Sequence, residues 1–253
     1  MSEVPSISIA GAGNVAFHLG KALISAGIKV DRIFNRDSEK ALLLSEKLGA
    51  EVVEKPEELE GSSLIICCIS DAALAEWIPK LSKIAPTVTT SGTIDALAFD
   101  HKHDIGVFYP MQTFSGTVPA DFSNIPIFIE ASSNSLRNLL TGIGDKLSSS
   151  VTELSAEKRG ELHVAAVFIN NFTNHMVDLG QQFLEKHHLP FDYFRPLLEQ
   201  TVAKLADKTA YEAQTGPARR NDTVTIEKHL AALEPEQREL YLLISNSIQK
   251  RYS

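Results

Sequence analysis

Short apolar runs alternate with longer amphipathic stretches through the first 150 residues of the chain. In the longer stretches apolar residues recur every three or four positions, which is the spacing of one helix face. Strands alternating with helices predict a parallel sheet covered on both faces. We therefore expect a doubly wound, mostly parallel α/β sheet of seven or so strands, ending near Ser150. The expected strands are the run up to Gly11 and residues 29–34, 50–53, 63–69, 87–90, 105–109 and 126–130.

From Ser155 onward the strand signals stop and helical spacing dominates. Residues 156–186 predict one helix of about 30 residues, or about 45 Å at about 1.5 Å per residue. We predict two domains, an α/β domain over residues 1–152 and an all-helical domain over residues 153–253. The long helix carries apolar residues on several faces, so we expect a homodimer through the helical domain. Further helices are expected at residues 191–206, 223–233 and 236–249.

The turn after the first strand has the spacing G-x-G-x-x-A. A strand, a glycine turn and a helix in this order form the context of a dinucleotide fingerprint. The first glycine allows the tight turn, the second has no Cβ to hold a pyrophosphate away, and the alanine is small enough for close helix–strand packing. Free N–H groups at the helix start would face the phosphates. The expected cofactor contacts here are Gly11, Ala12, Gly13, Asn14 and Val15.

The end of the second strand indicates which dinucleotide binds. An NAD site usually has an acidic residue there, which accepts a hydrogen bond from the ribose 2′-hydroxyl. This chain has Asn35 and Arg36 instead, and a guanidinium pairs well with a 2′-phosphate. Asp37 comes one residue late and suits the N-cap of the next helix. We therefore expect NADP (NADPH) rather than NAD, the alternative being that Arg36 is a solvated loop charge.

Polar residues follow three further strands at the edge where ligands bind in such sheets. Ser70, Ser91 and Gly92 are expected beside the cofactor. Asp71 is a candidate for the same place, and a role as N-cap of the helix over residues 72–81 explains it equally well. Tyr109 is a candidate for a substrate contact, and packing at the sheet end explains it equally well.

The predicted long helix carries an unusual number of hydrogen-bonding side chains. At about 100° per residue one stripe contains Arg159, His163, Val167, Asn170 and Asn174. These groups need partners, either a substrate and the nicotinamide amide or a buried polar network between subunits. His163 and Asn170 are therefore candidate catalytic residues together with Tyr109. No metal site is expected, because His163 and His175 are three helical turns apart.

Composition narrows the class of protein. The chain of 253 residues carries a formal charge of −8 without a basic stripe, which argues against nucleic acid as a partner. The longest apolar run is too short to cross a bilayer, and no signal peptide is recognised. Adjacent cysteines rarely pair, so Cys67 and Cys68 are expected to be buried reduced thiols in a cytoplasmic protein.

Several motifs resemble those of one family, the Rossmann-like NADP oxidoreductases with a C-terminal DUF2520 domain. These proteins are similar to coenzyme F420-dependent NADP oxidoreductase and, more distantly, to pyrroline-5-carboxylate reductase and 6-phosphogluconate dehydrogenase. The resemblance covers nearly the whole chain and implies a Rossmann domain followed by an all-α domain like the C-terminal one of 6-phosphogluconate dehydrogenase. The motifs are residues 11–16, 91–92, 110–114, 162–168 with 170–171, 215–217 and 220–222.

The chain also departs from related patterns. Histidine often replaces Thr89 and Tyr109 in the family, and glycine often replaces Asn221. Hydroxyacid dehydrogenases carry a catalytic lysine one turn before an asparagine, where this chain has Ala166 or Val167, neither of which can move a proton. The resemblance implies hydride transfer between NADP(H) and a small substrate, such as an imine, or a deazaflavin such as coenzyme F420. A non-catalytic NADP-binding regulatory or scaffold protein is the alternative.

Overall fold

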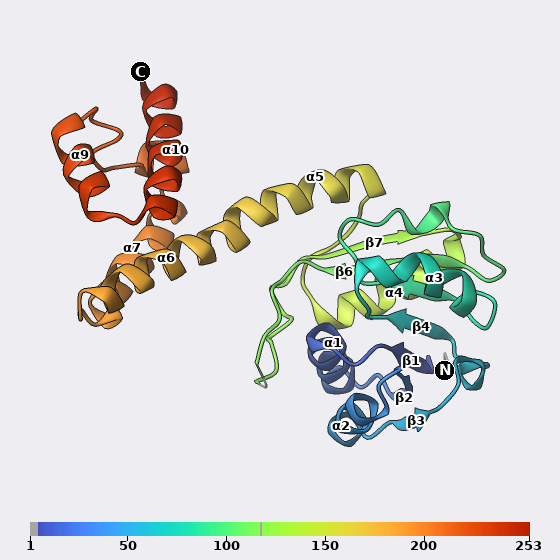
Figure 1. Ribbon diagram of the computed structural model, residues 1–253. Helices are drawn as coiled ribbons and strands as arrows, with labels where there is room; N and C mark the ends of the chain where they lie inside the picture. Colours follow the sequence, from blue (N-terminus) through green and yellow to red (C-terminus); the bar gives the residue numbers. More distant parts are fainter. Residues whose placement is uncertain (1–4, 117) are drawn as a thin grey trace. The chain divides into compact units, whose positions relative to one another are not determined.

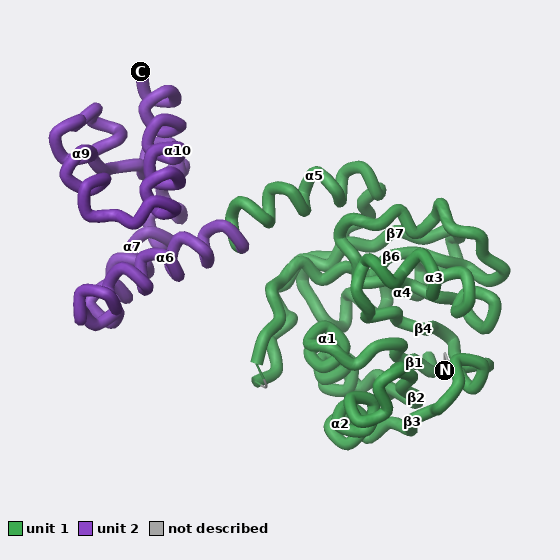
Figure 2. The backbone as a smooth tube through the Cα atoms, viewed as in Figure 1, with its two compact units in different colours: residues 1–170 green, residues 171–253 purple. Residues whose placement is uncertain are grey.

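The computed structural model describes residues 5–116 and 118–253. The chain divides into two compact units, residues 1–170 and 171–253 (Figure 2). The first unit extends beyond its last strand because helix α5 (Ala156–Ala166) is anchored to it by the buried Arg159. In the described part of the chain, no helix is long and apolar enough to cross a bilayer.

Eight strands form one sheet in the order β3-β2-β1-β4-β5-β6-β7-β8 (Figure 1). All neighbouring pairs are parallel except β6 and β7, so the doubly wound, mostly parallel sheet is confirmed. The sheet extends one short strand past its expected end near Ser150. The strands are β1 Ile7–Ala10, β2 Val30–Phe34, β3 Glu51–Val53, β4 Leu64–Cys67, β5 Thr87–Thr89, β6 Ile105–Pro110, β7 Ile127–Ala131 and β8 Val151–Glu153.

Helices cover both faces of this sheet. Along β4, Leu64 and Ile66 join the core beneath α1 (Asn14–Ser25), α2 (Ser38–Leu48) and α4 (Asn134–Leu147). Ile65 and Cys67 point to the opposite core, beneath α3 (Asp71–Leu81). Alternate side chains of one strand therefore fill two cores, which is why β4 reads as an unbroken apolar run. Short 3₁₀ turns cover Pro56–Leu59 and Ala96–Ala98.

The prediction of one regular helix over residues 156–186 is wrong in its middle. Helix α5 ends at Ala166, a π-helical segment covers Val167–Phe172, and α6 covers Thr173–Lys186. Val167 and Ile169 are β-branched and two asparagines follow, so α-helical geometry is least favoured there. The wider π turn changes the rotation per residue. The polar stripe predicted at about 100° per residue therefore stays on one face only as far as Ala166.

The second unit is all-helical. The expected helix over residues 191–206 is broken into the 3₁₀ turn Phe191–Phe194, α7 (Arg195–Ala203) and a second 3₁₀ turn, Lys204–Ala206. The unit is completed by α8 (Ala210–Ala213), α9 (Thr223–Ala232) and α10 (Pro235–Tyr252). Asn221 has a left-handed φ of 54°, which asparagine tolerates better than most residues. Asp222 caps α9 by accepting from the Thr225 amide at 3.0 Å.

Candidate active site

The glycine turn after β1 is shaped by the strand next to it. Gly11 has a φ of 114°, and a Cβ on it would lie 2.3 Å from the carbonyl oxygen of Cys68. Its amide donates to the carbonyl of Phe34 at 2.8 Å, which closes the turn against β2. Only glycine combines this φ with such a close backbone approach.

The start of α1 is open to a ligand. Gly13 is the N-cap residue without a side-chain cap, and the first turn holds no acidic residue. A Cβ on Gly13 would meet no atom within 4 Å, so this glycine borders open space. By contrast, Asp37 caps α2 and Ser133 caps α4. The free amides and positive dipole end of α1 are therefore available to an anion such as a phosphate.

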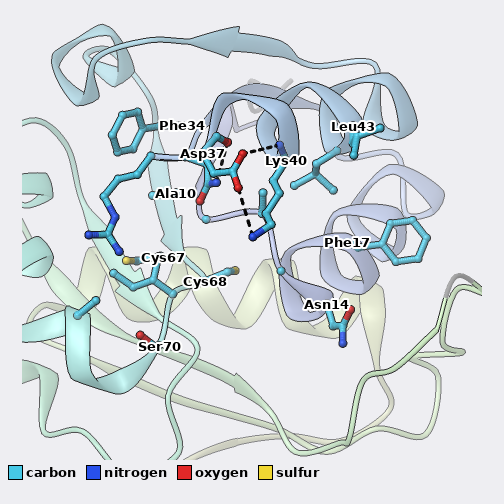
Figure 3. A pocket seen from close by; sticks show the side chains of 18 of the residues that line it. Ala10, Asn14, Phe17, Phe34, Asp37, Lys40, Leu43, Cys67, Cys68 and Ser70 are labelled. Atoms are coloured by element: carbon cyan, nitrogen blue, oxygen red, sulfur yellow. Dashed lines mark hydrogen bonds and ion pairs between the residues drawn. The ribbon is translucent and has the colours of Figure 1, made fainter.

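A cavity of about 630 Å³ lies over this turn (Figure 3). Of the residues predicted to contact the cofactor, seven line it: Gly11, Ala12, Gly13, Asn14, Asn35, Arg36 and Ser70. Val15 does not line this cavity and packs against the core instead. Ser91 and Gly92 do not line it either; they belong to a second cluster described below.

Most of the charged residues that line the cavity are cations. Arg36, Lys40 and Lys47 line it together with one carboxylate, that of Asp37. Asp37 accepts from the Lys40 amide at 3.2 Å, and its other oxygen lies 3.3 Å from the ammonium group, as Figure 3 shows. These contacts lower the pKa of Asp37. The sequence prediction missed Lys40 and Lys47, although Lys40 lies in the first turn of the helix that follows Arg36.

Two aromatic residues add an apolar part to the lining of the cavity. Phe34 and Trp77 lie with ring centroids 5.3 Å apart and both line the cavity. A flat aromatic base fits such a wall, and the cations beside it fit a 2′-phosphate. With the open helix start, the residues present therefore fit a dinucleotide that carries an additional phosphate.

A second polar cluster lies at the carboxyl ends of β5 and β6. The Tyr109 hydroxyl is 3.4 Å from Nδ1 of His163, and both side chains are partly buried. Gly92 lies against the pair, since a Cβ on it would be 2.8 Å from both His163 Nδ1 and Tyr109 Cζ. The Ser91 hydroxyl accepts from the amides of Thr93 and Ile94, which shapes the loop. Two predicted catalytic residues and two predicted cofactor residues thus come together.

Burial raises the pKa of Tyr109, while nearby Arg159 lowers it and Asp71 raises it. The phenol therefore stays protonated near neutral pH and can donate a hydrogen bond to His163 or to a bound molecule. Imidazole in turn is the side chain that exchanges protons most readily near neutral pH. The Tyr109–His163 pair is able to move a proton.

Asp71 and Asn170 differ from their expected placement. Ser70 is the N-cap of α3, whereas Asp71 is its first residue and accepts from the Thr93 hydroxyl at 2.6 Å. Asp71 therefore joins α3 to the loop after β5. Asn170 is exposed and lies in the π-helical segment, where the helical register that would align it with His163 is lost.

Arg159 anchors the helix that carries His163. Its side chain is 0% exposed and pairs with the Glu130 carboxylate at 2.7 Å. It also donates to the carbonyls of Ile94 at 2.6 Å and Leu154 at 3.2 Å. Arg159 precedes His163 by about one helical turn, so these bonds hold the histidine against Tyr109. Arg159, the first residue of the predicted polar stripe, therefore belongs to a buried polar network within the first unit.

The two cysteines are free and buried, as expected. Burial raises the pKa of both thiols, that of Cys68 to about 12. Both are therefore unreactive thiols beside the cavity. Within residues 5–116 and 118–253, no group of three or more His, Cys, Asp or Glu residues is arranged to hold a metal ion.

Two family models match the chain. Residues 6–98 match "NADP oxidoreductase coenzyme F420-dependent" and residues 125–248 match the domain of unknown function DUF2520. The chain is 39% identical to "putative NADP oxidoreductase BF3122" from Bacteroides fragilis, with a TM-score of 0.92 over 97% of this chain and 98% of that one. A search of curated proteins found no match.

Two further solved structures share the fold. Protein TM1727 from Thermotoga maritima is 18% identical with a TM-score of 0.76, covering 96% of this chain and 98% of that one. An imine reductase from Myxococcus stipitatus in complex with NADP⁺ is 16% identical with a TM-score of 0.63, covering 97% and 92%. At these identities the likeness concerns the fold alone.

Proposed function

Because the chain belongs to the family of NADP oxidoreductases with a C-terminal DUF2520 domain, we propose that it transfers a hydride between NADP(H) and a small substrate. The observation that carries the proposal is the cavity that joins the uncapped start of α1 to Arg36 and Lys40. The nicotinamide, when bound, supplies or accepts the hydride. The amides of α1 hold the pyrophosphate, and the two cations hold the 2′-phosphate.

The substrate lies, in this proposal, at the second cluster. Tyr109 and His163 orient it and move one proton, and Gly92, which has no Cβ, lets these two side chains pack against the loop after β5. No lysine stands one helical turn before Asn170, so a reaction that depends on lysine is not supported. A small imine or a deazaflavin such as coenzyme F420 suits this site, because the reduction of either adds one hydride at carbon and one proton at nitrogen. The free buried thiols support a cytoplasmic location.

We predict that NADPH binds at least about tenfold more tightly than NADH (about 1.4 kcal/mol), because Arg36 replaces the acidic ribose partner. Arg36→Ala should remove most of that preference and leave NADH affinity unchanged. Trp77 is the only tryptophan of the chain and lines the cavity, so quenching of its fluorescence reports binding. Lys83→Ala, an exposed site away from the cavity, makes the same charge change and should have no effect.

Equal affinities for the two cofactors in the unmodified protein would refute the NADP assignment. Turnover is tested separately by following NADPH absorbance with a panel of cyclic imines and with oxidised coenzyme F420. Tight NADPH binding without turnover of any of them would favour a non-catalytic NADP-binding protein.

We also propose a homodimer formed through the second unit. Between residues 171 and 253 only two hydrophobic side chains, Leu184 and Ala218, are fully buried. Large apolar residues on α7 and α10 are exposed, among them Leu197 and Leu243. A unit with so thin a core needs a further apolar surface, and a second copy of the same face supplies it.

Light scattering at micromolar concentration should therefore give about twice the chain mass of 27.7 kDa. Leu243 is 67% exposed, and Leu243→Glu should shift the protein toward the monomer, because the charge would be buried in the interface. Leu42 on α2 is 55% exposed and provides the matched control, since Leu42→Glu should leave the mass unchanged. A monomeric unmodified protein would refute the dimer.

A further inference from the structure

The segment between β6 and β7 crosses the start of α1. We refer to its described residues, 111–116 and 118–122, as the strap; it is the green loop that runs beside α1 in Figure 1. Asn14 donates from its side chain to the carbonyl of Phe114 at 3.1 Å. Phe114 stacks on His18 with ring centroids 5.2 Å apart and on Phe122 at 5.5 Å. Gly116 is part of the cavity lining.

His18 makes the second polar contact between α1 and the strap. The ring is 2% exposed, and its Nδ1 accepts a hydrogen bond from the backbone amide of Ala120 at 3.1 Å. An imidazole nitrogen that accepts a hydrogen bond carries no proton. The remaining proton is then on Nε2, which is buried and has no hydrogen-bond partner among the described residues. The observed contact therefore requires the neutral ring in one tautomer.

We propose that His18 is a positioning residue. Its neutral ring holds the strap over the glycine turn that follows β1, and protonation of the ring releases the strap. A proton on Nδ1 would face the Ala120 N–H, so the proton and the strap compete for the same nitrogen. The ring's other contacts, Phe17 and Phe114, are aromatic and offer a cation no carboxylate. Losing the hydrogen bond from the Ala120 amide would remove one of the contacts that hold the strap, and with it the cavity-lining Gly116, against α1.

No charged group on the neighbouring elements that the structure describes offsets the loss of this contact when His18 is protonated. On α1 itself Lys21 follows one turn later, and on α2 Lys47 lies 4.9 Å from the Phe17 ring centroid. In the strap, the Asp121 carboxylate is exposed and accepts from the Ser123 amide at 2.9 Å. The charged residues of α4, which also packs on α1, are Arg137, Asp145 and Lys146. In the described part of the chain, neither of the two carboxylates forms an ion pair with His18, and the four cations would repel a charged ring.

This inference rests on the proposed NADP binding, and the unmodified protein tests both. Its dissociation constant for NADP⁺ is measured by Trp77 fluorescence at about pH 8 and about pH 5.5, on either side of ordinary imidazole titration. The same measurement is made on His18→Gln, whose amide oxygen can accept from Ala120 without titrating. Affinity of the unmodified protein should fall at least about tenfold more than that of the variant. Protonation of the 2′-phosphate of NADP⁺ changes the affinity of both proteins equally, so it cancels when the two are compared.

Two further measurements complete the test. His18→Leu replaces the ring with an apolar side chain that has no acceptor. This variant should bind NADP⁺ weakly at both pH values. Hydrogen exchange of peptides covering residues 118–122, corrected for intrinsic rates, should rise at low pH in the unmodified protein and not in His18→Gln. Equal pH dependence of affinity and exchange in the two proteins would overturn the proposal. Failure of the unmodified protein to bind NADP⁺ at about pH 8 would instead refute the proposed function, and the exchange data would still decide the role of His18.

Discussion

Replacing His163 by glutamine should lower turnover by about 10²-fold or more, with cofactor affinity and melting temperature nearly unchanged. Glutamine can keep the contact with Tyr109, now 3.4 Å from Nδ1, but it cannot exchange a proton near neutral pH. The assay uses the substrate that the imine and deazaflavin panel identifies, and Trp77 fluorescence gives the cofactor affinity.

Two variants define how this loss is interpreted. His101 is exposed and contacts the carbonyl of Phe99, so His101→Gln should leave turnover unchanged. Tyr109→Phe removes the hydroxyl that faces His163 and should also slow turnover. If His163→Gln instead lowers the melting temperature and leaves the turnover of the folded protein intact, the histidine is structural.

Arg159→Met should destabilise the first unit by about 3–5 kcal/mol, because it leaves a carboxylate in a largely buried place without its cation. Glu130 is only 13% exposed, and its oxygen lies 2.7 Å from the guanidinium. The carbonyls of Ile94 and Leu154 would lose donors as well. Urea unfolding followed by Trp77 fluorescence reports on this unit, since the only tryptophan lies in it.

The double variant Arg159→Met with Glu130→Gln separates the pair from the packing. Removing both charges should restore part of the lost stability, because no uncompensated carboxylate remains. Arg137→Met makes a matched comparison at a more exposed pair with Glu153 and should change stability by less than about 1 kcal/mol. A loss below about 1 kcal/mol for Arg159→Met would show that the buried pair contributes little.

Local patterns were sufficient to predict most of the first unit. The apolar run around Ile65 and the spacing of Gly11 and Gly13 are local signals, and the strand, turn and helix formed as expected. The family resemblance read from the motifs is confirmed by the matches over residues 6–98 and 125–248. The cap Asp37 was predictable because capping depends on neighbours in sequence.

Features that depend on distant partners were not predictable. Strand β8 has three residues, two of them polar, and forms only because β7 offers an edge. Asp71 accepts from the hydroxyl of Thr93, 22 positions away, a contact that neither of the two roles expected for Asp71 includes. The π-helical segment has no periodic signature of its own. The strap contacts of Asn14 and His18 join residues about 100 positions apart, so the motif around Phe114 had no evident role in the sequence.

The close approach between Gly11 and the Cys68 carbonyl has a consequence for the order of folding. Strand β1 precedes β2 and β4 in the chain but lies between them in the sheet. Because Cys68 donates to the Ala10 carbonyl at 2.7 Å, β4 forms one wall of the glycine turn. An emerging polypeptide that ends before Cys68 can form β1 and α1 but lacks that wall. The proposed nucleotide pocket is therefore completed during synthesis only after β4 has left the ribosome and has paired with β1.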